Sequence, residues 1–237
     1  MTQPFYRALP GMLLTFCLSS QAISGGISLG QTRVIFSSAD KAQTITISNS
    51  GNQAYLIQTR VQKELNDTAA APFIVTPPLF SLQGNSRQIL RLLPQSFSLP
   101  VGRESLFYIS VSAIPAQSDP ITLTDRLSVG VRFVIKLFYR PQGLPADSSA
   151  CFLMFRREPH VVRVVNSSGY FQTIGMISFD KRPKELVQEM SMVPPYGSII
   201  LPFEKAVNRV DWQTLNDFGG LSDVCHQAGL PATEVAP

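Results

Sequence analysis

The sequence predicts an all-β protein made of two sandwich domains. Short stretches rich in β-branched and aromatic residues recur along the whole chain, and turn residues such as Asn, Gly and Pro separate them. No amphipathic helix of convincing length interrupts this series. Residues 140–149, which are rich in Pro, Gly, Ala and Ser, divide it into two halves of roughly 100 residues each. The hydrophobic content of 44%, with only 15% charged residues, supports a packed core.

The first half contains a series of short strand signals. Each combines β-branched or aromatic residues with alternation or a short apolar run. The signals are residues 32–36, 43–49, 54–62, 87–93 and 105–114. Turns are predicted between them at residues 49–52, 76–80, 82–86 and 99–104. This spacing is typical of an antiparallel sandwich.

A longer signal, RLSVGVRFVIKLFYRP at residues 126–141, closes the first half. Every second residue from Leu127 to Tyr139 is apolar, so the stretch predicts one strand with an apolar face. Such a strand would span roughly 45–50 Å, which is more than a single small sandwich covers. Either its first part is an exposed edge that pairs with another chain, or Gly130 divides the run into a loop and an ordinary buried strand. The pattern alone favours neither interpretation.

The second half again predicts strands separated by turns. The turns are expected at residues 166–169 and 194–197. The predicted strand segments are residues 151–157, 160–166, 170–179, 185–193 and 197–203, with a last stretch at 211–224.

The first 22 residues have the features of a secretory signal peptide. Arg7 precedes a short apolar core, and Ser20 and Ala22 are small residues suited to cleavage after residue 22. The apolar core is shorter than the roughly 20 residues needed to span a membrane. We therefore predict export without membrane insertion of the mature chain. The predicted parts are a signal peptide at residues 1–22, an N-terminal domain at 23–142 that includes the long strand, and a C-terminal domain at 143–237.

Charge and motif content argue against nucleic-acid binding and catalysis. The net charge is +4, and the basic residues are spread along the chain. The sequence has no phosphate-binding Gly-rich loop, no Gly-x-Ser-x-Gly motif and no His-Glu-x-x-His motif. Its two histidines, His160 and His226, are far apart and form no metal motif with the cysteines. We predict a protein that is not an enzyme and has no cofactor or metal.

Two cysteines, Cys151 and Cys225, remain after removal of the signal peptide. In an oxidising compartment they could form a disulfide, or they could be two separate buried thiols. The sequence leaves both readings open.

Several motifs occur in an order that carries a family resemblance. They are TRVIF, TPPLFSL, RQILRLLP, LPVGRESLFYISVSAIP, IKLFYRP and NDFGG. With them the chain resembles the periplasmic pilus chaperones of the chaperone–usher pathway, from about residue 28 to residue 225. The resemblance implies two immunoglobulin-like domains in an L, a periplasmic location, and the binding, folding and capping of pilus subunits, which are delivered to an outer-membrane usher.

The resemblance also implies roles for particular residues. A donor strand would enter the groove of an incomplete subunit with Leu127, Val129, Val131 and Phe133. The carboxylate at the subunit's C-terminus would be held by Arg33 and Lys136. An ion network that sets the angle between the domains would contain Glu104, Arg140 and Asp217. By strand parity, Lys136 should face the side opposite to the apolar odd-numbered residues.

Two other functions remain as alternatives. The first is a fimbrial subunit or adhesin-like sandwich that binds an extracellular ligand. The Gly-rich start, ISGGISLGQ, and the Pro-containing end, AGLPATEVAP, argue against it, because neither resembles a donated strand. The second is a sandwich that binds a small ligand, which would require a concave polar site.

Overall fold

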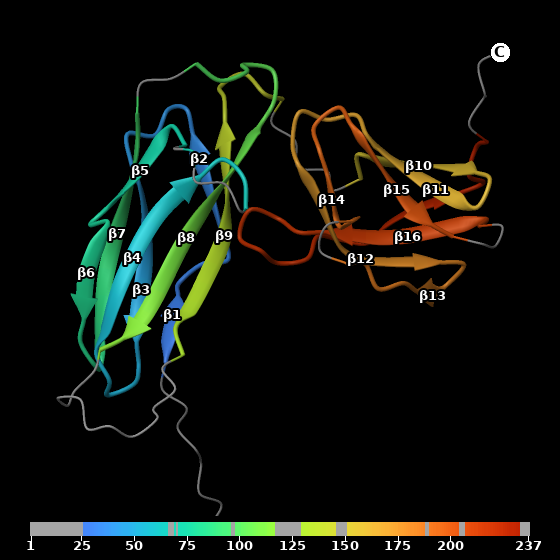
Figure 1. The fold of residues 1–237 in the computed structure, drawn as a ribbon. Helices are drawn as coiled ribbons and strands as arrows, with labels where there is room; N and C mark the ends of the chain where they lie inside the picture. Colours follow the sequence, from blue (N-terminus) through green and yellow to red (C-terminus); the bar gives the residue numbers. More distant parts are fainter. Residues whose placement is uncertain are drawn as a thin grey trace, which may run out of the picture.

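The computed structural model describes residues 26–65, 69, 71–95, 98–116, 129–145, 151–187, 190–203 and 207–232. The predicted signal peptide, residues 1–22, and Leu127 of the predicted donor strand therefore lie outside the described residues. The described residues form two β-sandwiches and contain no α-helix, as the sequence predicted. In Figure 1 the long axes of the two sandwiches lie across one another, which gives the molecule an L shape.

The first sandwich consists of two sheets that together run from residue 27 to residue 140. One sheet has the order β1 (Ile27–Leu29), β3 (Gln43–Asn49), β7 (Ser86–Pro94) and β5 (Phe73–Thr76). The other has the order β2 (Arg33–Ser37), β9 (Val131–Arg140), β8 (Ser105–Pro115), β4 (Tyr55–Gln62) and β6 (Leu79–Leu82). The pairs within these sheets are antiparallel, except that β2 and β9 run parallel.

The chain changes sheets between β1 and β2. β1 pairs with β3, and the amide of Gly30 still donates to the carbonyl of Thr46 at 2.8 Å. After Thr32 the chain joins the opposite sheet, where Arg33 lies in register with Lys136 and Ser37 with Arg140. Because β2 begins only at Arg33, it pairs with the second half of β9 and leaves the first half uncovered.

The core of the first sandwich comes from alternate residues of both sheets. Fully buried aliphatic side chains from one sheet meet those of the other, and Phe73 packs edge-on against both Phe36 and Phe107. Each such side chain stabilises the fold by about 1.5–3 kcal/mol when fully buried. The largest aliphatic members with complete burial are Ile45, Ile47, Leu90 and Leu92, facing Ile57, Ile109 and Leu137.

The sequence did not predict three short strands of this sandwich. β1, β5 and β6 were not expected, because each has four residues or fewer and shows too little alternation to register. The turn predicted at residues 76–80 is correspondingly too long. Pro77 and Pro78 lack amide donors and end the pairing there, but Leu79 and Phe80 already belong to β6.

The second sandwich is smaller. One sheet has the order β10 (Leu153–Glu158), β11 (Val161–Asn166) and β15 (Ser198–Pro202). The other has the order β13 (Arg182–Pro183), β12 (Gln172–Phe179), β16 (Arg209–Thr214) and β17 (Cys225–Ala228), and β14 (Met192–Val193) also pairs with β12. Phe155 and Trp212 meet in its core with ring centroids 4.7 Å apart.

Two strand predictions in this half are wrong. Of residues 185–193, only Met192–Val193 are in a strand, because the preceding residues form no ladder among those described. In the stretch 211–224, β16 ends at Thr214 and the motif NDFGG forms a loop. Gly219 has a φ of +84° within this loop, a left-handed conformation that is incompatible with a regular strand.

Candidate functional site

The first half of β9 is a free sheet edge. Its residues Val131 to Ile135 pair with β8 on one side, and no described residue pairs with them on the other side, where β2 begins only opposite Lys136. An edge of this kind presents unpaired backbone N–H and C=O groups to which another strand can add. Figure 1 shows β9 at the side of the sheet that faces the second domain's loops.

The side chains along this edge change gradually from buried to exposed. Leu137 and Ile135 belong to the core, and Phe133 packs against it while partly buried. Val131 is 47% exposed, and Val129 is 64% exposed. The apolar face of the strand therefore continues past the end of the core that it helps to form, and nothing among the described residues covers its beginning.

The strand is shorter than the sequence signal. β9 begins at Val131, so Val129 and Gly130 precede it. Gly130 thus lies just before the strand, as expected if it separates a loop from an ordinary buried strand. The open edge and the exposed Val131 agree instead with an edge that pairs with another chain. The assignment of Val129, Val131 and Phe133 to a donor strand stays a prediction.

Two cations meet where the free edge ends. Arg33 opens β2, and its register partner across the parallel ladder is Lys136. The Nε of Arg33 is buried without a hydrogen-bond partner among the described residues, and its guanidinium carbon lies 5.7 Å from the centre of the Phe138 ring. Among those same residues no hydrogen bond or ion pair reaches the side-chain amine of Lys136.

The electrostatics of this pair favour an anion. Burial lowers the pKa of Arg33, although the carboxylates of Asp217 and Glu104 act in the opposite direction. Burial also lowers the pKa of Lys136, and the neighbouring charge of Arg33 lowers it further. A carboxylate placed between these two adjacent cations would stabilise the charged form of both, because it can accept charge-assisted hydrogen bonds from each of them.

Lys136 and the odd-numbered apolar residues of β9 lie on opposite faces of the strand. The β8–β9 ladder runs from Val131 to Tyr139 without a register shift, so parity is kept along the strand. The even-numbered face, which includes Lys136, is directed to the second domain. On that face Phe138 is buried and lies 5.7 Å, centroid to centroid, from Phe171 of the second domain.

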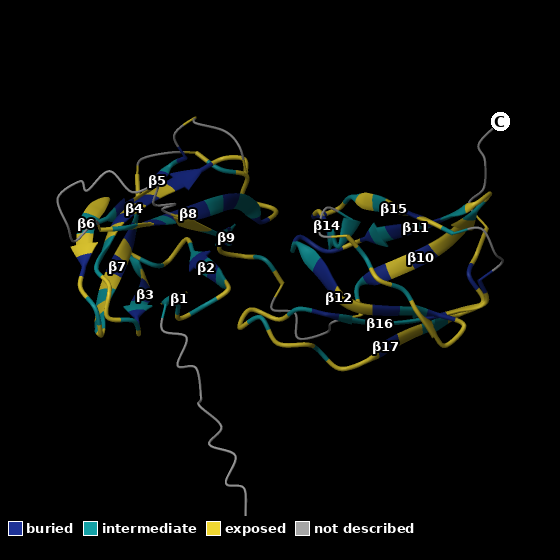
Figure 2. Ribbon diagram, turned by 60° about the horizontal axis from the view of Figure 1, so that its bottom comes forward, coloured by how far each residue is buried: buried dark blue, intermediate teal, exposed yellow. Residues whose placement is uncertain are grey.

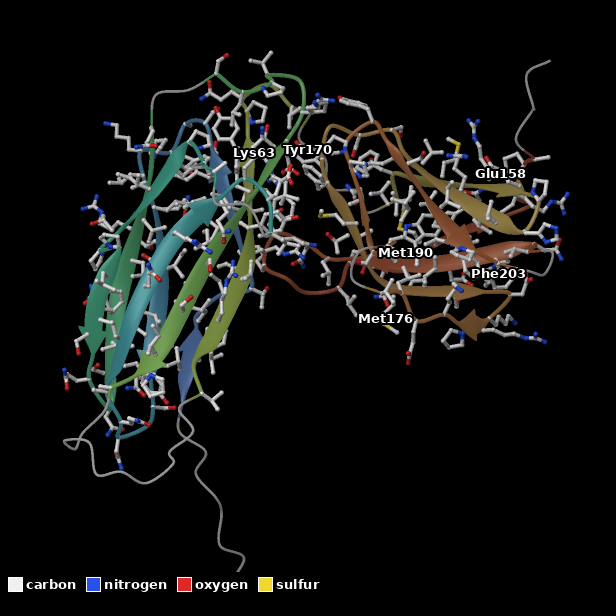
Figure 3. The ribbon with its side chains drawn as sticks, viewed as in Figure 1. Lys63, Glu158, Tyr170, Met176, Met190 and Phe203 are labelled. Atoms are coloured by element: carbon white, nitrogen blue, oxygen red, sulfur yellow. A yellow bond between two sulfur atoms is a disulfide. The ribbon has the colours of Figure 1, made fainter. Side chains whose placement is uncertain are left out.

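Glu104, Arg140 and Asp217 form a continuous ion network between the domains. The Nε of Arg140 donates to Glu104 Oε1 at 2.8 Å. Its Nη1 and Nη2 donate to the two carboxylate oxygens of Asp217 at 2.7 and 2.8 Å, in a bidentate pair. Arg140 also lies over the Tyr170 ring, 5.0 Å from its centre, at the junction of the two sandwiches (Figure 3).

Glu104 is the buried member of this network. The amide of Phe171 donates to its Oε2 at 2.9 Å, and its own amide donates to the carbonyl of Gly169 at 2.8 Å. Burial raises the pKa of Glu104, and the Phe171 amide and Arg140 only partly oppose this. Burial also disfavours the charge of Arg140, but its hydrogen bond to Asp217 and the charge of Glu104 prevail and raise its pKa.

The NDFGG loop between β16 and β17 carries Asp217 to the first domain. The side-chain oxygen of Asn216 accepts hydrogen bonds from the amides of Phe218 and Gly220 at 3.0 and 2.9 Å. An Asn that binds backbone amides in this way closes a tight turn. Figure 2 shows this largely exposed loop extending from the second sandwich toward the first.

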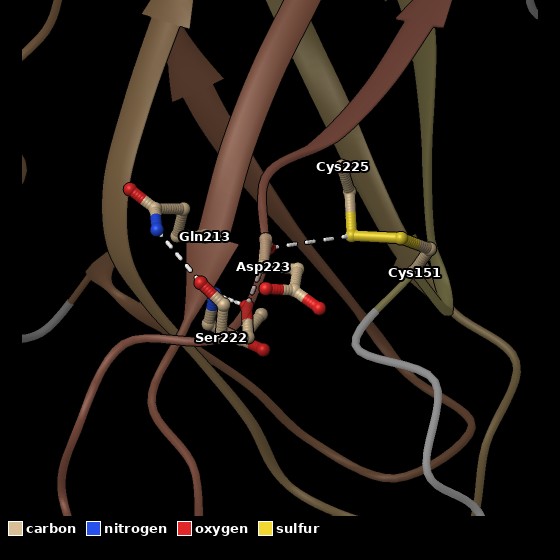
Figure 4. The surroundings of a disulfide bond; sticks show 6 residues. Cys151, Gln213, Ser222, Asp223 and Cys225 are labelled. Carbon is tan, nitrogen blue, oxygen red and sulfur yellow. Dashed lines mark hydrogen bonds between the residues drawn. A yellow bond between two sulfur atoms is a disulfide. The ribbon is translucent and has the colours of Figure 1, made fainter.

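The other two predicted site residues, Cys151 and Cys225, form a disulfide, so the structure contains the bonded form of the two that the sequence left open. Cys225 opens β17, directly after the loop, and the bond ties it to the beginning of the second domain (Figure 4). Nearby, the carbonyl of Ser222 accepts from Gln213 Nε2 at 2.7 Å, and its hydroxyl accepts from the Thr214 amide at 3.0 Å. These bonds hold the C-terminal end of the loop on β16.

Sequence reasoning missed several residues around these sites. Gly169, Tyr170 and Phe171 contact Glu104 or Arg140, yet they come from a turn whose sequence carries no signal for the other domain. Arg132 was also missed. Its guanidinium donates to Ser110 Oγ and Gln62 Oε1, both at 2.8 Å, across β8 and β4. Only its position on the even-numbered face of β9 could have indicated this.

No helix among the described residues is long and apolar enough to cross a membrane. Within the same residues, no group of three or more His, Cys, Asp and Glu side chains is arranged to hold a metal ion.

The structure places an open strand edge that ends at a pair of cations beside the junction of two sandwiches, and an edge of this kind can bind another chain by strand addition. Comparison with known proteins identifies the family. Residues 26–145 match the family described as the pili and flagellar-assembly chaperone, PapD N-terminal domain. Residues 151–226 match the pili assembly chaperone PapD, C-terminal domain. The chain belongs to this family of pilus-assembly chaperones, and its two domains have the immunoglobulin-like fold that the resemblance implied.

Relatives and solved structures agree with this assignment. The probable fimbrial chaperone LpfB of Escherichia coli O157:H7 is 34% identical over 219 residues, which cover 90% of this chain and 93% of the relative. The chaperone FimC of Escherichia coli K12 is 34% identical over 226 residues, with 88% and 91% covered. A chain from the solved complex of the Salmonella enterica SafA pilin with the SafB chaperone matches with a TM-score of 0.74 and 28% identity, covering 86% of this chain and 96% of that one.

Membership of this family confirms three of the predictions. The protein is a pilus-assembly chaperone, its fold is the predicted pair of all-β domains, and its class is not that of an enzyme. The alternative of a pilus subunit or adhesin is not favoured, because the family matches cover both domains. The domain limits 23–142 and 143–237 stay a prediction.

Proposed function

We propose that this chain captures pilus subunits in the periplasm by adding the free edge of β9 to the subunit's incomplete sandwich. The observation that carries the proposal is the position of two unpaired cations, Arg33 and Lys136, at the end of an open strand edge. The subunit's C-terminal strand would lie along residues 131–135, over roughly 16 Å, with its terminal carboxylate between the two cations.

This arrangement fixes the direction of the added strand. Its C-terminus lies at Lys136 and its body extends toward Val131, so it runs parallel to β9. β2 is also parallel to β9 and begins at Arg33. The added strand would therefore continue the line of β2 and end where β2 starts. Holding the carboxylate sets the register, since a slip of one residue would turn every side chain to the wrong face.

The apolar side chains at and just before the start of β9 would supply most of the binding energy. Val131 and Val129 are exposed and available, Phe133 is partly so, and Leu127 lies outside the described residues. Burial of three such side chains gives a gross gain of ~5–9 kcal/mol, at ~1.5–3 kcal/mol each. The cost of association reduces this gain. The net affinity would hold a subunit and still permit its exchange for another donated strand without nucleotide hydrolysis.

Strand donation needs a fixed angle between the domains. The buried contact of Glu104 with Arg140 and the Phe171 amide joins the domains beside the cation pair. We infer that this network orients the second domain without touching the subunit. Its energetic value lies in the buried Glu104 contact, because exposed ion pairs contribute only ~0–1 kcal/mol.

The periplasmic location and the outer-membrane usher belong to the same proposal. The signal-peptide features of residues 1–22 support export. A disulfide between Cys151 and Cys225 is stable in an oxidising compartment such as the periplasm. The usher is inferred from the family alone, and the SafA–SafB complex supports pilus subunits as the class of partner.

Co-purification from the periplasm tests the proposal. A candidate pilus subunit is co-expressed with the wild-type chain, with Arg33→Ala plus Lys136→Ala, or with Arg87→Ala as a control. Arg87 is an exposed cation of β7 in the opposite sheet. Loss of the anchor should weaken binding by ~2–5 kcal/mol, the range for unpairing one side of a buried charge pair.

The outcomes separate the parts of the mechanism. Retention of the subunit by the control and its loss from the double variant, still folded, supports the carboxylate anchor. Equal binding by all three proteins would leave strand addition without this anchor. If no candidate subunit binds to the wild-type chain, the proposal fails.

A further inference from the structure

Phe218, at the tip of the NDFGG loop, is 95% exposed. Single exposed apolar residues are common and need no explanation by themselves. Phe218 differs because the residues on both sides of it are fixed. An exposed aromatic ring on a rigid support loses little entropy on binding, and such residues often dominate the energy of an interface.

Three contacts fix the loop around Phe218. The Phe218 amide donates to the Asn216 side chain at 3.0 Å. Both carboxylate oxygens of Asp217 are bound by Arg140 of the first domain. Gly219 approaches the first domain so closely that a Cβ placed on it would lie 2.5 Å from the Thr32 hydroxyl oxygen. The loop is therefore anchored to the first domain immediately before and after the phenylalanine.

The loop brings Phe218 near the cation pair of Arg33 and Lys136. Thr32, which Gly219 contacts, directly precedes Arg33, and Arg33 is in register with Lys136. Lys136 lies on the face of β9 that is directed to the second domain, as does the buried Phe138. A strand whose carboxylate ends at Arg33 and Lys136 thus brings its last side chains next to this loop. The loop also carries two further exposed apolar residues, Leu221 and Val224.

We propose that Phe218 is a specificity contact of the second domain, which packs against an apolar side chain at the last or next-to-last position of the captured subunit. This inference rests on the proposed function, since it requires the subunit's carboxylate at the cation pair. The cations would recognise any free C-terminus, whereas Phe218 would select those that present an apolar side chain toward the loop.

A double-mutant cycle tests the contact. The full mature chain and its Phe218→Ala variant are titrated with synthetic peptides of alternating apolar residues that end in a free carboxylate. The peptides carry Leu or Ala at the last or next-to-last position, and matching peptides end in an amide. Leu79→Ala serves as a control, because Leu79 is an exposed apolar residue on β6, at the other edge of the same sheet.

We expect Phe218→Ala to reduce affinity about tenfold for the peptide with Leu at one of the two positions, and less than about twofold for the Ala peptide. Leu79→Ala should leave every affinity unchanged. Thermal unfolding should be unaffected by Phe218→Ala, because the ring is exposed and the loop contacts are made by its neighbours.

The two proposals fail in different ways. Equal losses for Leu and Ala peptides at both positions, or no loss at all, would overturn the role of Phe218 while acid peptides still bind better than amides. Equal binding of acid and amide peptides, or binding of none, would contradict the carboxylate anchor and with it this inference.

Discussion

Arg140→Met is expected to destabilise the protein mainly through the carboxylate that it leaves behind. Methionine is unbranched and carries no charge, so all three hydrogen bonds to Glu104 and Asp217 are lost, together with the cation–π contact to Tyr170. The Asp217 side chain is 48% exposed and can be hydrated, so loss of its ion pair with Arg140 costs only ~0–1 kcal/mol. The Glu104 side chain is 2% exposed and keeps the Phe171 amide as its remaining side-chain partner. Removing one partner of a buried pair costs ~3–5 kcal/mol.

The cost should depend on pH. Burial already raises the pKa of Glu104, and removal of the cation raises it further. A carboxyl whose folded pKa lies above its unfolded pKa contributes stability below the unfolded value and loses it as the pH rises through the folded value. The variant should therefore lose least relative to wild type near about pH 5 and most near about pH 8.

Urea unfolding of both proteins across this range measures the effect. The double variant Glu104→Gln plus Arg140→Met is the matched control, because its neutral amide still accepts from Phe171. It should recover much of the loss near about pH 8 and show little pH dependence. A cost below about 1 kcal/mol, or the same cost at every pH, would refute the view that a buried carboxylate holds the domains together.

Three further perturbations test other parts of the structure. Lys136→Met should stabilise the free protein by about 0.5–2 kcal/mol, because the lowered pKa of Lys136 means that its charged form costs stability at neutral pH. The same variant should lose subunit capture, and a variant that unfolds at a lower urea concentration than wild type would contradict this expectation. Replacing both Cys151 and Cys225 with Ser opens a loop with a sequence separation of 74 and should cost about 2–4 kcal/mol, and wild type under reducing conditions should unfold at the same urea concentration as the variant. Gly219→Ala, at a φ of +84° and in contact with Thr32, should cost about 1–3 kcal/mol, whereas Gly102→Ala, whose Cβ would meet no atom within 4 Å, should be neutral in the same assay.

Strands with strong alternation could be predicted from the sequence, and those without it could not. β3, β4, β7 and β8 lie within a residue or two of their predicted limits because each presents one face to a core. β1 and β6 are too short to show a period, and β1 exists only because the chain changes sheets between Gly30 and Thr32. That change depends on pairing with β3 and β9, far along the chain.

The same limit applies to the site. Parity along β9 correctly placed Lys136 opposite the apolar residues, since a regular ladder preserves it. The sequence pattern left open whether residues 131–135 form a free edge, because this depends on β2 beginning only at Arg33. The contacts of Glu104 with Gly169 and Phe171 join two domains, and neither alternation nor turn chemistry carries information across a domain boundary.

Strand addition at β9 is the central claim, and amide hydrogen exchange tests it most directly. Exchange is measured for the free chain and for its complex with a captured pilus subunit, with β6 at the other edge of the same sheet as an internal control. The account predicts that alternate amides among residues 131–135, those directed away from β8, exchange freely in the free chain and become protected in the complex, while Leu79–Leu82 do not change. Capture of the subunit without new protection along residues 131–135 would contradict it.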